Sequence, residues 1–224
     1  MPTTPPVVVF DVNETLSDLE PMAQRFAEVG APAHLAKAWF ASVLRDGFAL
    51  TAAGAQERFS VLAEENLRRE LAGLTLELET PAAVEHVLSG FMDLHVHPDV
   101  PDGIRALHAA GLRVVTLTNG GTVVADRLLT GAGLREHFEQ LLSVEDAGVW
   151  KPAPGAYEYA ARACGCAVAE LLLVAVHPWD IDGAARAGAR TAWINRSGAD
   201  YPAYFTPPDI TVPGLGELAS EPAT

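Results

Sequence analysis

Residues 7–16 of this chain read Val-Val-Val-Phe-Asp-Val-Asn-Glu-Thr-Leu, and this segment decides the fold. Its first four residues are apolar and β-favouring, which predicts a buried strand. Ligands of open parallel sheets bind in the crevice beyond the carboxyl ends of such strands. Asp11 lies at that end, and the Thr15 hydroxyl follows four residues later. An oriented, partly desolvated carboxylate can act as a nucleophile, although Asp11 taken alone would be expected to cap the next helix.

The composition indicates a globular protein with a sizeable core. The chain has 224 residues, of which 49% are hydrophobic and 20% are charged. These values suit one α/β domain with an insertion, or two small domains. The net charge of −14 disfavours nucleic acid and anionic membranes as partners, because phosphate contacts need Lys and Arg. With no signal-like leader and no apolar stretch of transmembrane length, we expect a cytoplasmic protein.

Two short motifs contain metal-binding residue types but lack further ligands. Cys164 and Cys166 are too close in sequence for an ordinary disulfide, and no Cys or His cluster accompanies them. His95 and His97 also lack an evident third ligand, which favours a structural linker. The sequence therefore predicts no metal site.

The order of predicted elements indicates the fold class. Apolar residues recur at helical spacing from about 16 to 94, which predicts a bundle of several helices. After residue 98 we expect helices at 104–110, 122–129, 152–164 and 181–187, and strands at 113–117, 141–144, 171–176, 191–194 and 210–212. Such alternation implies a parallel, helix-flanked sheet. The prediction is an α/β protein with a Rossmann-like core (1–16 and 97–224) and an inserted helical cap (17–96).

Two later segments place polar groups at predicted element ends. Thr118 and Asn119 precede two glycines at a helix start, a pattern that can bind an anion or simply complete a turn. Lys151 precedes a predicted helix, where it can hold Asp11 ionised, although a lone Lys is usually solvated. Tyr157 lies nearly two helical turns further on and can face the same side as Lys151.

A third segment, residues 176–180, closes another buried strand. Asp180 is a second carboxylate at the same sheet edge, able to orient Lys151 or a water molecule. For His177, packing in a loop and a catalytic role are both open.

These four segments, in this order, resemble the haloacid dehalogenase superfamily over nearly the whole chain, and within it the type II (L-2-haloacid) dehalogenases. The superfamily's phosphatases carry an acid/base Asp two residues after the nucleophile and an early Asp in the last motif as a Mg²⁺ ligand. Here these positions hold Asn13 and Val176. Fewer oxygen ligands disfavour Mg²⁺, and a departing halide needs no proton. The resemblance thus implies metal-independent dehalogenation without a cofactor.

The resemblance also implies a mechanism. Asp11 would displace halide from C2 of a short 2-haloacid, and water near Asp180 would hydrolyse the ester. Thr15 and Lys151 would orient and neutralise Asp11. Thr118 and backbone N–H groups would hold the substrate carboxylate, and Tyr157 would support Lys151. The halide and alkyl pocket would be lined by Asn119, Phe59, Leu44 and Trp179.

The chain departs from the family pattern at several site positions. Phe40 stands where the family has a halide-gripping Arg, and Arg45 lies nearby at a different helical angle. Asn13 replaces an aromatic residue, while Ala175 and His177 replace Ser and Asn. Two alternatives therefore stay open: a Mg²⁺-dependent phosphatase of the same superfamily, and a catalytically silent binding protein. A homodimer is a further expectation, since related dehalogenases form one.

Overall fold

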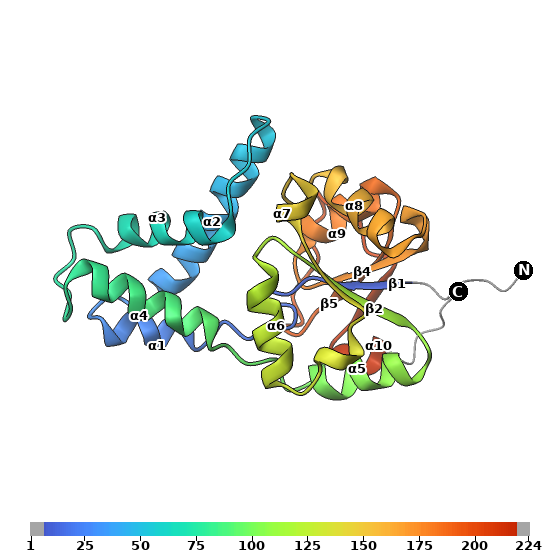
Figure 1. Ribbon diagram of the computed structural model, residues 1–224, viewed down its shortest axis with the longest axis horizontal. Helices are drawn as coiled ribbons and strands as arrows, with labels where there is room; N and C mark the ends of the chain where they lie inside the picture. Colours follow the sequence, from blue (N-terminus) through green and yellow to red (C-terminus); the bar gives the residue numbers. More distant parts are fainter. Residues whose placement is uncertain (1–6, 219–224) are drawn as a thin grey trace, which may run out of the picture.

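The computed structural model describes residues 7–218 and contains one six-stranded sheet (Figure 1). The order is β3-β2-β1-β4-β5-β6, and every neighbouring pair is parallel. The strands are β1 Val7–Phe10, β2 Arg113–Thr118, β3 Gln140–Ser143, β4 Leu171–Ala175, β5 Arg190–Ile194 and β6 Ile210–Val212. The predicted α/β class and parallel sheet are confirmed.

The first strand lies in the middle of the sheet because all four of its side chains are apolar and buried. Val8 and Phe10 pack on one face, whereas Val7 and Val9 pack on the other, as the two-residue period of a strand requires. The helices that cover the first face are α5 Val100–Ala109, α6 Thr122–Gly131 and α10 Leu215–Leu218; those on the second are α8 Pro154–Cys164 and α9 Pro178–Ala187. Figure 1 shows α5 and α10 on the opposite side of the sheet from α8 and α9.

The insertion after β1 is a helical unit with its own apolar core. Its helices are α1 Met22–Glu28, α2 Leu35–Ala52, α3 Phe59–Leu71 and α4 Thr80–Met92. Trp39 is fully buried there; its indole N–H donates to the carbonyl of Ala63 (2.8 Å), and its ring lies near those of Phe26 and Phe91. We refer to this unit as the cap. It lies beside the sheet-containing part in Figure 1.

The chain enters and leaves the cap through two adjacent segments. The Asp18 N–H donates to the His95 carbonyl (2.8 Å), and the His97 N–H donates to the Leu16 carbonyl (2.9 Å). These bonds join the two connections close to the end of β1. The cap is thereby anchored beside Asp11, while the exact boundaries at 16/17 and 96/97 stay a prediction.

Three helix starts differ from the predicted ones. Helix α5 begins at Val100 rather than at 104, because Pro101 fits the first turn of a helix, where its missing N–H is not needed. Helix α8 begins at Pro154 rather than at 152, so Lys151 lies in the preceding loop. Helix α9 begins at Pro178 rather than at 181, which puts Asp180 in its first turn. These shifts change how Lys151 and Asp180 are presented to the site.

Between residues 7 and 218, no helix is long and apolar enough to cross a membrane. The same part of the chain has no group of three or more His, Cys, Asp and Glu side chains that could hold a metal ion. Cys164 is buried and Cys166 is half-buried, both as free thiols.

Candidate active site

Asp11 continues the ladder at the end of β1, where its N–H donates to the Val174 carbonyl (3.0 Å). Its carboxylate is 5% exposed. Oδ2 accepts a hydrogen bond from the Thr15 hydroxyl (2.7 Å), whose oxygen in turn accepts from the Val176 N–H (3.1 Å). Thr15 therefore joins the carboxylate to the end of β4, in the position that its four-residue spacing from Asp11 predicts.

Lys151 supplies a cation to Asp11 from a fully buried position. Its Nζ lies 2.9 Å from Asp11 Oδ1 and 2.6 Å from Asp180 Oδ2. Asn119 holds the backbone of the same residue, because its Oδ1 accepts from the Lys151 N–H (2.9 Å) and its Nδ2 donates to the Lys151 carbonyl (3.3 Å). Asn119, predicted to line the halide pocket, thus uses its amide to position Lys151.

Tyr157 contacts Asp180 rather than Lys151. Its hydroxyl lies 2.6 Å from Asp180 Oδ1, and both side chains are buried. The predicted support of Lys151 by Tyr157 therefore acts through Asp180. Since Oδ2 of Asp180 bonds to Lys151 and Oδ1 to Tyr157, this carboxylate orients the lysine.

Gly183 allows helix α9 to approach this group closely. A Cβ at Gly183 would come within 2.5 Å of the Pro152 Cβ and 2.7 Å of the Tyr157 hydroxyl. Real Cβ atoms essentially never approach other atoms so closely. A glycine here therefore keeps Asp180, in the first turn of the same helix, in contact with both Lys151 and Tyr157.

His177 lies against Asp11, the predicted nucleophile. Its Nδ1 is 3.0 Å from Asp11 Oδ2, and its Nε2 is 2.8 Å from Glu14 Oε2. The ring stacks on Trp179 at 5.0 Å between centroids, and Trp179 in turn meets Phe48 of cap helix α2 at 4.9 Å. The sequence left the role of His177 open, and it missed Glu14. The position of Glu14 between Asp11 and Thr15 was a signal that it belongs to the site. Its partner His177, however, is 163 positions away in the sequence.

The charges around Asp11 keep it ionised. Burial alone would raise its pKa, but Lys151 and His177 outweigh burial and hold the pKa well below its ordinary value. Burial lowers the pKa of Lys151, yet Asp11 and Asp180 raise it above the usual value. Burial likewise lowers the pKa of His177, while hydrogen bonds to Asp11 and Glu14 raise it to about 9. At neutral pH, Asp11 is an anion between two cations.

A family model described as haloacid dehalogenase-like hydrolase matches residues 5–188. The chain belongs to this family. (S)-2-haloacid dehalogenase of Pseudomonas sp. (strain YL) is 30% identical over 210 residues, covering 93% of this chain and 90% of that protein. Haloacetate dehalogenase H-2 of Moraxella sp. (strain B) is 35% identical over 128 residues, covering 57% of each chain.

Solved structures of the L-2-haloacid dehalogenase group share the whole fold. That of L-2-haloacid dehalogenase from Xanthobacter autotrophicus with chloropropionic acid covalently bound matches with a TM-score of 0.85 and 25% identity, covering 97% of this chain and 98% of that chain. The resemblance to this group inferred from the motif order is thereby confirmed, and so is the inserted helical segment. The remaining predicted site residues are those that the resemblance to this group implied.

The segment predicted to bind an anion or to complete a turn lies at the end of β2. Thr118 Oγ1 accepts from the Gly120 N–H (2.9 Å), and the Ser143 hydroxyl donates to the Gly120 carbonyl (2.7 Å). A Cβ at Gly120 would lie 3.3 Å from Thr118 Oγ1 and 3.7 Å from Asn13 Nδ2. The structure thus brings Thr118 and Asn13 together beside the backbone of Gly120, next to the start of helix α6. Their contact with a substrate stays a prediction.

The predicted apolar residues Phe40, Leu44 and Phe59 pack in the cap cluster. The Phe59 ring stacks at 6.1 Å on Trp150, whose indole N–H donates to the Glu57 carbonyl (3.0 Å). Because Trp150 precedes Lys151, the cap core reaches the edge of the site. A contact of these three residues with a substrate stays a prediction.

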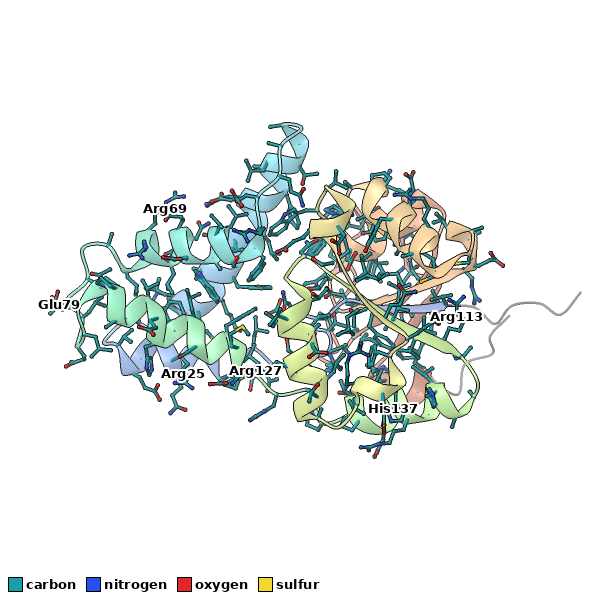
Figure 2. All side chains as sticks on the ribbon, in the orientation of Figure 1. Arg25, Arg69, Glu79, Arg113, Arg127 and His137 are labelled. Atoms are coloured by element: carbon teal, nitrogen blue, oxygen red, sulfur yellow. The ribbon has the colours of Figure 1, made fainter. Side chains whose placement is uncertain are left out.

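The family has an arginine at the position of Phe40. Among residues 7–218, no arginine close to Phe40 in the sequence replaces it. Arg45 bonds to its neighbour Asp46 (2.8 Å), and its side chain is 58% exposed. Figure 2 shows Arg25 and Arg69 on the cap and Arg127 between the cap and α6. Arg127 pairs with Asp93, which directly follows α4. Near Asp11, the charged donors are instead Lys151 and His177.

Proposed function

We propose that this haloacid dehalogenase-like chain is a metal-independent dehalogenase of short 2-haloacids that acts through an ester on Asp11. The observation that carries the proposal is the buried Asp11 carboxylate, held by Lys151, Thr15 and His177 at 2.7–3.0 Å. Asn13 occupies the position at which a phosphatase of the superfamily would carry its proton donor. Displacement of a halide needs no such donor.

The geometry suits one oxygen of Asp11 for attack. Oδ2 accepts two hydrogen bonds, whereas Oδ1 accepts one from Lys151 and retains a lone pair. Attack of Oδ1 on C2 from the side opposite the halogen would form the C–O bond, invert the carbon and release halide with its electron pair. Exclusion of water favours this step, because a desolvated carboxylate is the stronger nucleophile.

The substrate carboxylate would bind at the start of helix α6. Thr118 and the backbone N–H groups after Gly120 lie there, and the N-terminus of a ten-residue helix attracts anions. This placement would put C2 of the substrate beside Asp11, since β1 and β2 are neighbours in the sheet. The (S)-2-haloacid dehalogenase relative and the covalently bound chloropropionic acid in the Xanthobacter structure support a 2-haloacid and a covalent route.

The direct test is halide release from L-2-chloropropionate and from monohaloacetates. We expect turnover in the wild type, loss of turnover in Asp11→Asn, and indifference to EDTA. In a single turnover in ¹⁸O-labelled water, the label should enter Asp11 while the new hydroxyl of the product remains unlabelled. Label appearing in the product without first entering the protein would contradict the ester route.

The alternatives predict different results. A Mg²⁺-dependent phosphatase would hydrolyse phosphomonoesters, lose activity with EDTA and tolerate or gain from Asn13→Asp. A silent binding protein would show no mass increase after incubation with haloacid. The proposed homodimer is checked separately by light scattering, with a monomer mass at all concentrations as the contradicting result.

A further inference from the structure

Two carboxylates hold the ring of His177, one on each nitrogen. Nδ1 lies 3.0 Å from Asp11 Oδ2, and Nε2 lies 2.8 Å from Glu14 Oε2. When the imidazole is neutral, a proton on Nε2 can donate to Glu14, which leaves the Nδ1 lone pair facing Asp11. This is the arrangement in which a carboxylate orients a histidine base toward a reacting centre.

The backbone of Glu14 adopts an unfavourable conformation that holds this pair. Among residues 7–218, Glu14 is the only non-glycine residue with positive φ, at 62°. An L-residue pays a steric cost in this region, and such outliers cluster at active sites. His97 Nε2 lies 3.0 Å from the Glu14 carbonyl, and the Glu14 N–H donates to the Ser17 hydroxyl (3.3 Å). The fold thus supports a glutamate where glycine would be easier to place.

Asp180 is poorly placed to take a proton from water. Its side chain is 0% exposed, and its two oxygens accept from Lys151 and Tyr157 at 2.6 Å each. His177, in contrast, is 12% exposed and lies next to the carboxylate on which the ester would form. Of the two groups, His177 is therefore the one that a hydrolytic water can reach.

We propose that His177, positioned by Glu14, is the general base that takes a proton from the water that hydrolyses the Asp11 ester. The inference rests on the proposed function, because it concerns the second half of that reaction. It assigns a catalytic role to His177 and a positioning role to Glu14. It also places this water beside His177, whereas the family resemblance implied a water near Asp180.

The proton balance follows from the charges around the ring. The groups that face His177 are Asp11 and Glu14 directly, with Lys151 and Asp180 beyond Asp11. In the free enzyme, Asp11 and Glu14 raise the pKa of His177 to about 9, so the ring is protonated. Alkylation removes the negative charge of Asp11, which is the larger of the two causes that raise the pKa of His177. In the proposed cycle, the imidazolium then loses its proton to solvent.

Neutral His177 can next accept a proton from water as the water oxygen attacks Cγ of Asp11. The bond from Cγ to the substrate oxygen then breaks, and the leaving alkoxide takes the second proton of that water. Asp11 returns to a carboxylate and His177 to an imidazolium. Each turnover releases one halide and one proton, as the overall hydrolysis requires.

The test separates the two halves of the reaction with L-2-chloropropionate and His177→Asn. We expect a burst of one halide per enzyme, followed by an ester that persists on the denatured protein by mass spectrometry. Steady-state turnover should fall by roughly 10²- to 10⁴-fold, the usual contribution of a general base. Ester hydrolysis should rise with pH in the wild type and lose this dependence in His177→Asn.

Two further variants guard against a folding defect. Glu14→Gly suits the backbone at φ 62°, so the melting temperature should not fall, while ester hydrolysis slows and the halide burst remains. The matched control is His86→Asn, which breaks a His–Glu pair of the same 2.8 Å separation on the cap, and it should behave as wild type.

Ester hydrolysis at the wild-type rate in His177→Asn would overturn the inference. So would a slower halide burst without ester accumulation, because that result would make His177 only a positioning residue for Asp11. If the wild type itself forms no adduct, the proposed function fails and this inference fails with it. Failure confined to the variants leaves the proposed function intact.

Discussion

Lys151 Nζ lies 2.6 Å from Asp180 Oδ2, and neither side chain is exposed to solvent. Lys151 also lies 2.9 Å from Asp11, so one buried ammonium serves two carboxylates. Desolvation of such charges is costly, and an uncompensated partner is costlier still. The site therefore depends on all three charges being present together, although they come from three separate elements.

Replacement of Lys151 by Met should strongly destabilise the protein. It leaves Asp11 and Asp180 without their shared cation, and the removal of one member of a buried ion pair typically costs about 3–5 kcal/mol. Urea denaturation measures the change. The matched control is Lys37→Met, which removes an exposed lysine and should change stability by less than about 0.5 kcal/mol. Equal losses in the two variants would contradict the pairing.

The Tyr157→Phe variant should weaken the support of Asp180. It removes the hydroxyl that donates to Oδ1 at 2.6 Å and leaves a buried carboxylate oxygen without that partner. Hydrogen bonds to charged groups contribute about 1.5–3 kcal/mol, so we expect a loss of stability of that size. Halide release should fall by less than in Asp11→Asn. Unchanged stability would show that Asp180 does not need this donor.

The close approach at Gly183 predicts an overpacking defect in Gly183→Ala. The new methyl group would meet Pro152 and the Tyr157 hydroxyl, at an expected cost of about 1–3 kcal/mol. Gly131→Ala, in helix α6, is the control because a Cβ there meets nothing within 4 Å. That change should be neutral or should stabilise the protein by up to about 1 kcal/mol. Thermal unfolding compares the two.

Protonation of His177 predicts how stability depends on pH. Its pKa is about 9 in the folded protein against 6.5 ordinarily, so the folded state binds this proton more tightly. The resulting contribution, at most about 3 kcal/mol, is fully present below pH 6.5 and is lost as pH rises toward 9. Urea denaturation across that range should show a shallower decline in His177→Asn than in the wild type. Identical slopes would contradict the assignment.

Much of the core could be predicted because its signals are local. The four apolar residues of β1 require burial on both faces, and the alternation of strands and helices after residue 98 requires a parallel sheet. The contact of Thr15 with Asp11 also follows from a short spacing along the chain. These features depend on residues close in sequence, whose geometry the backbone periods determine.

Other relationships at the site were decided only by tertiary structure. The partnership of Tyr157 with Asp180 depends on where helices α8 and α9 begin and on how closely Gly183 lets them approach. The contact of Glu14 with His177 joins residues 163 positions apart through the alignment of β1 with β4. By itself, then, the sequence determined the sheet, the inserted helices and the position of Asp11 at the end of β1, because these follow from local periodicity and spacing. The partners of the other charged residues depend on the register between strands and on how closely the helices approach one another. No single segment of the sequence encodes these relationships.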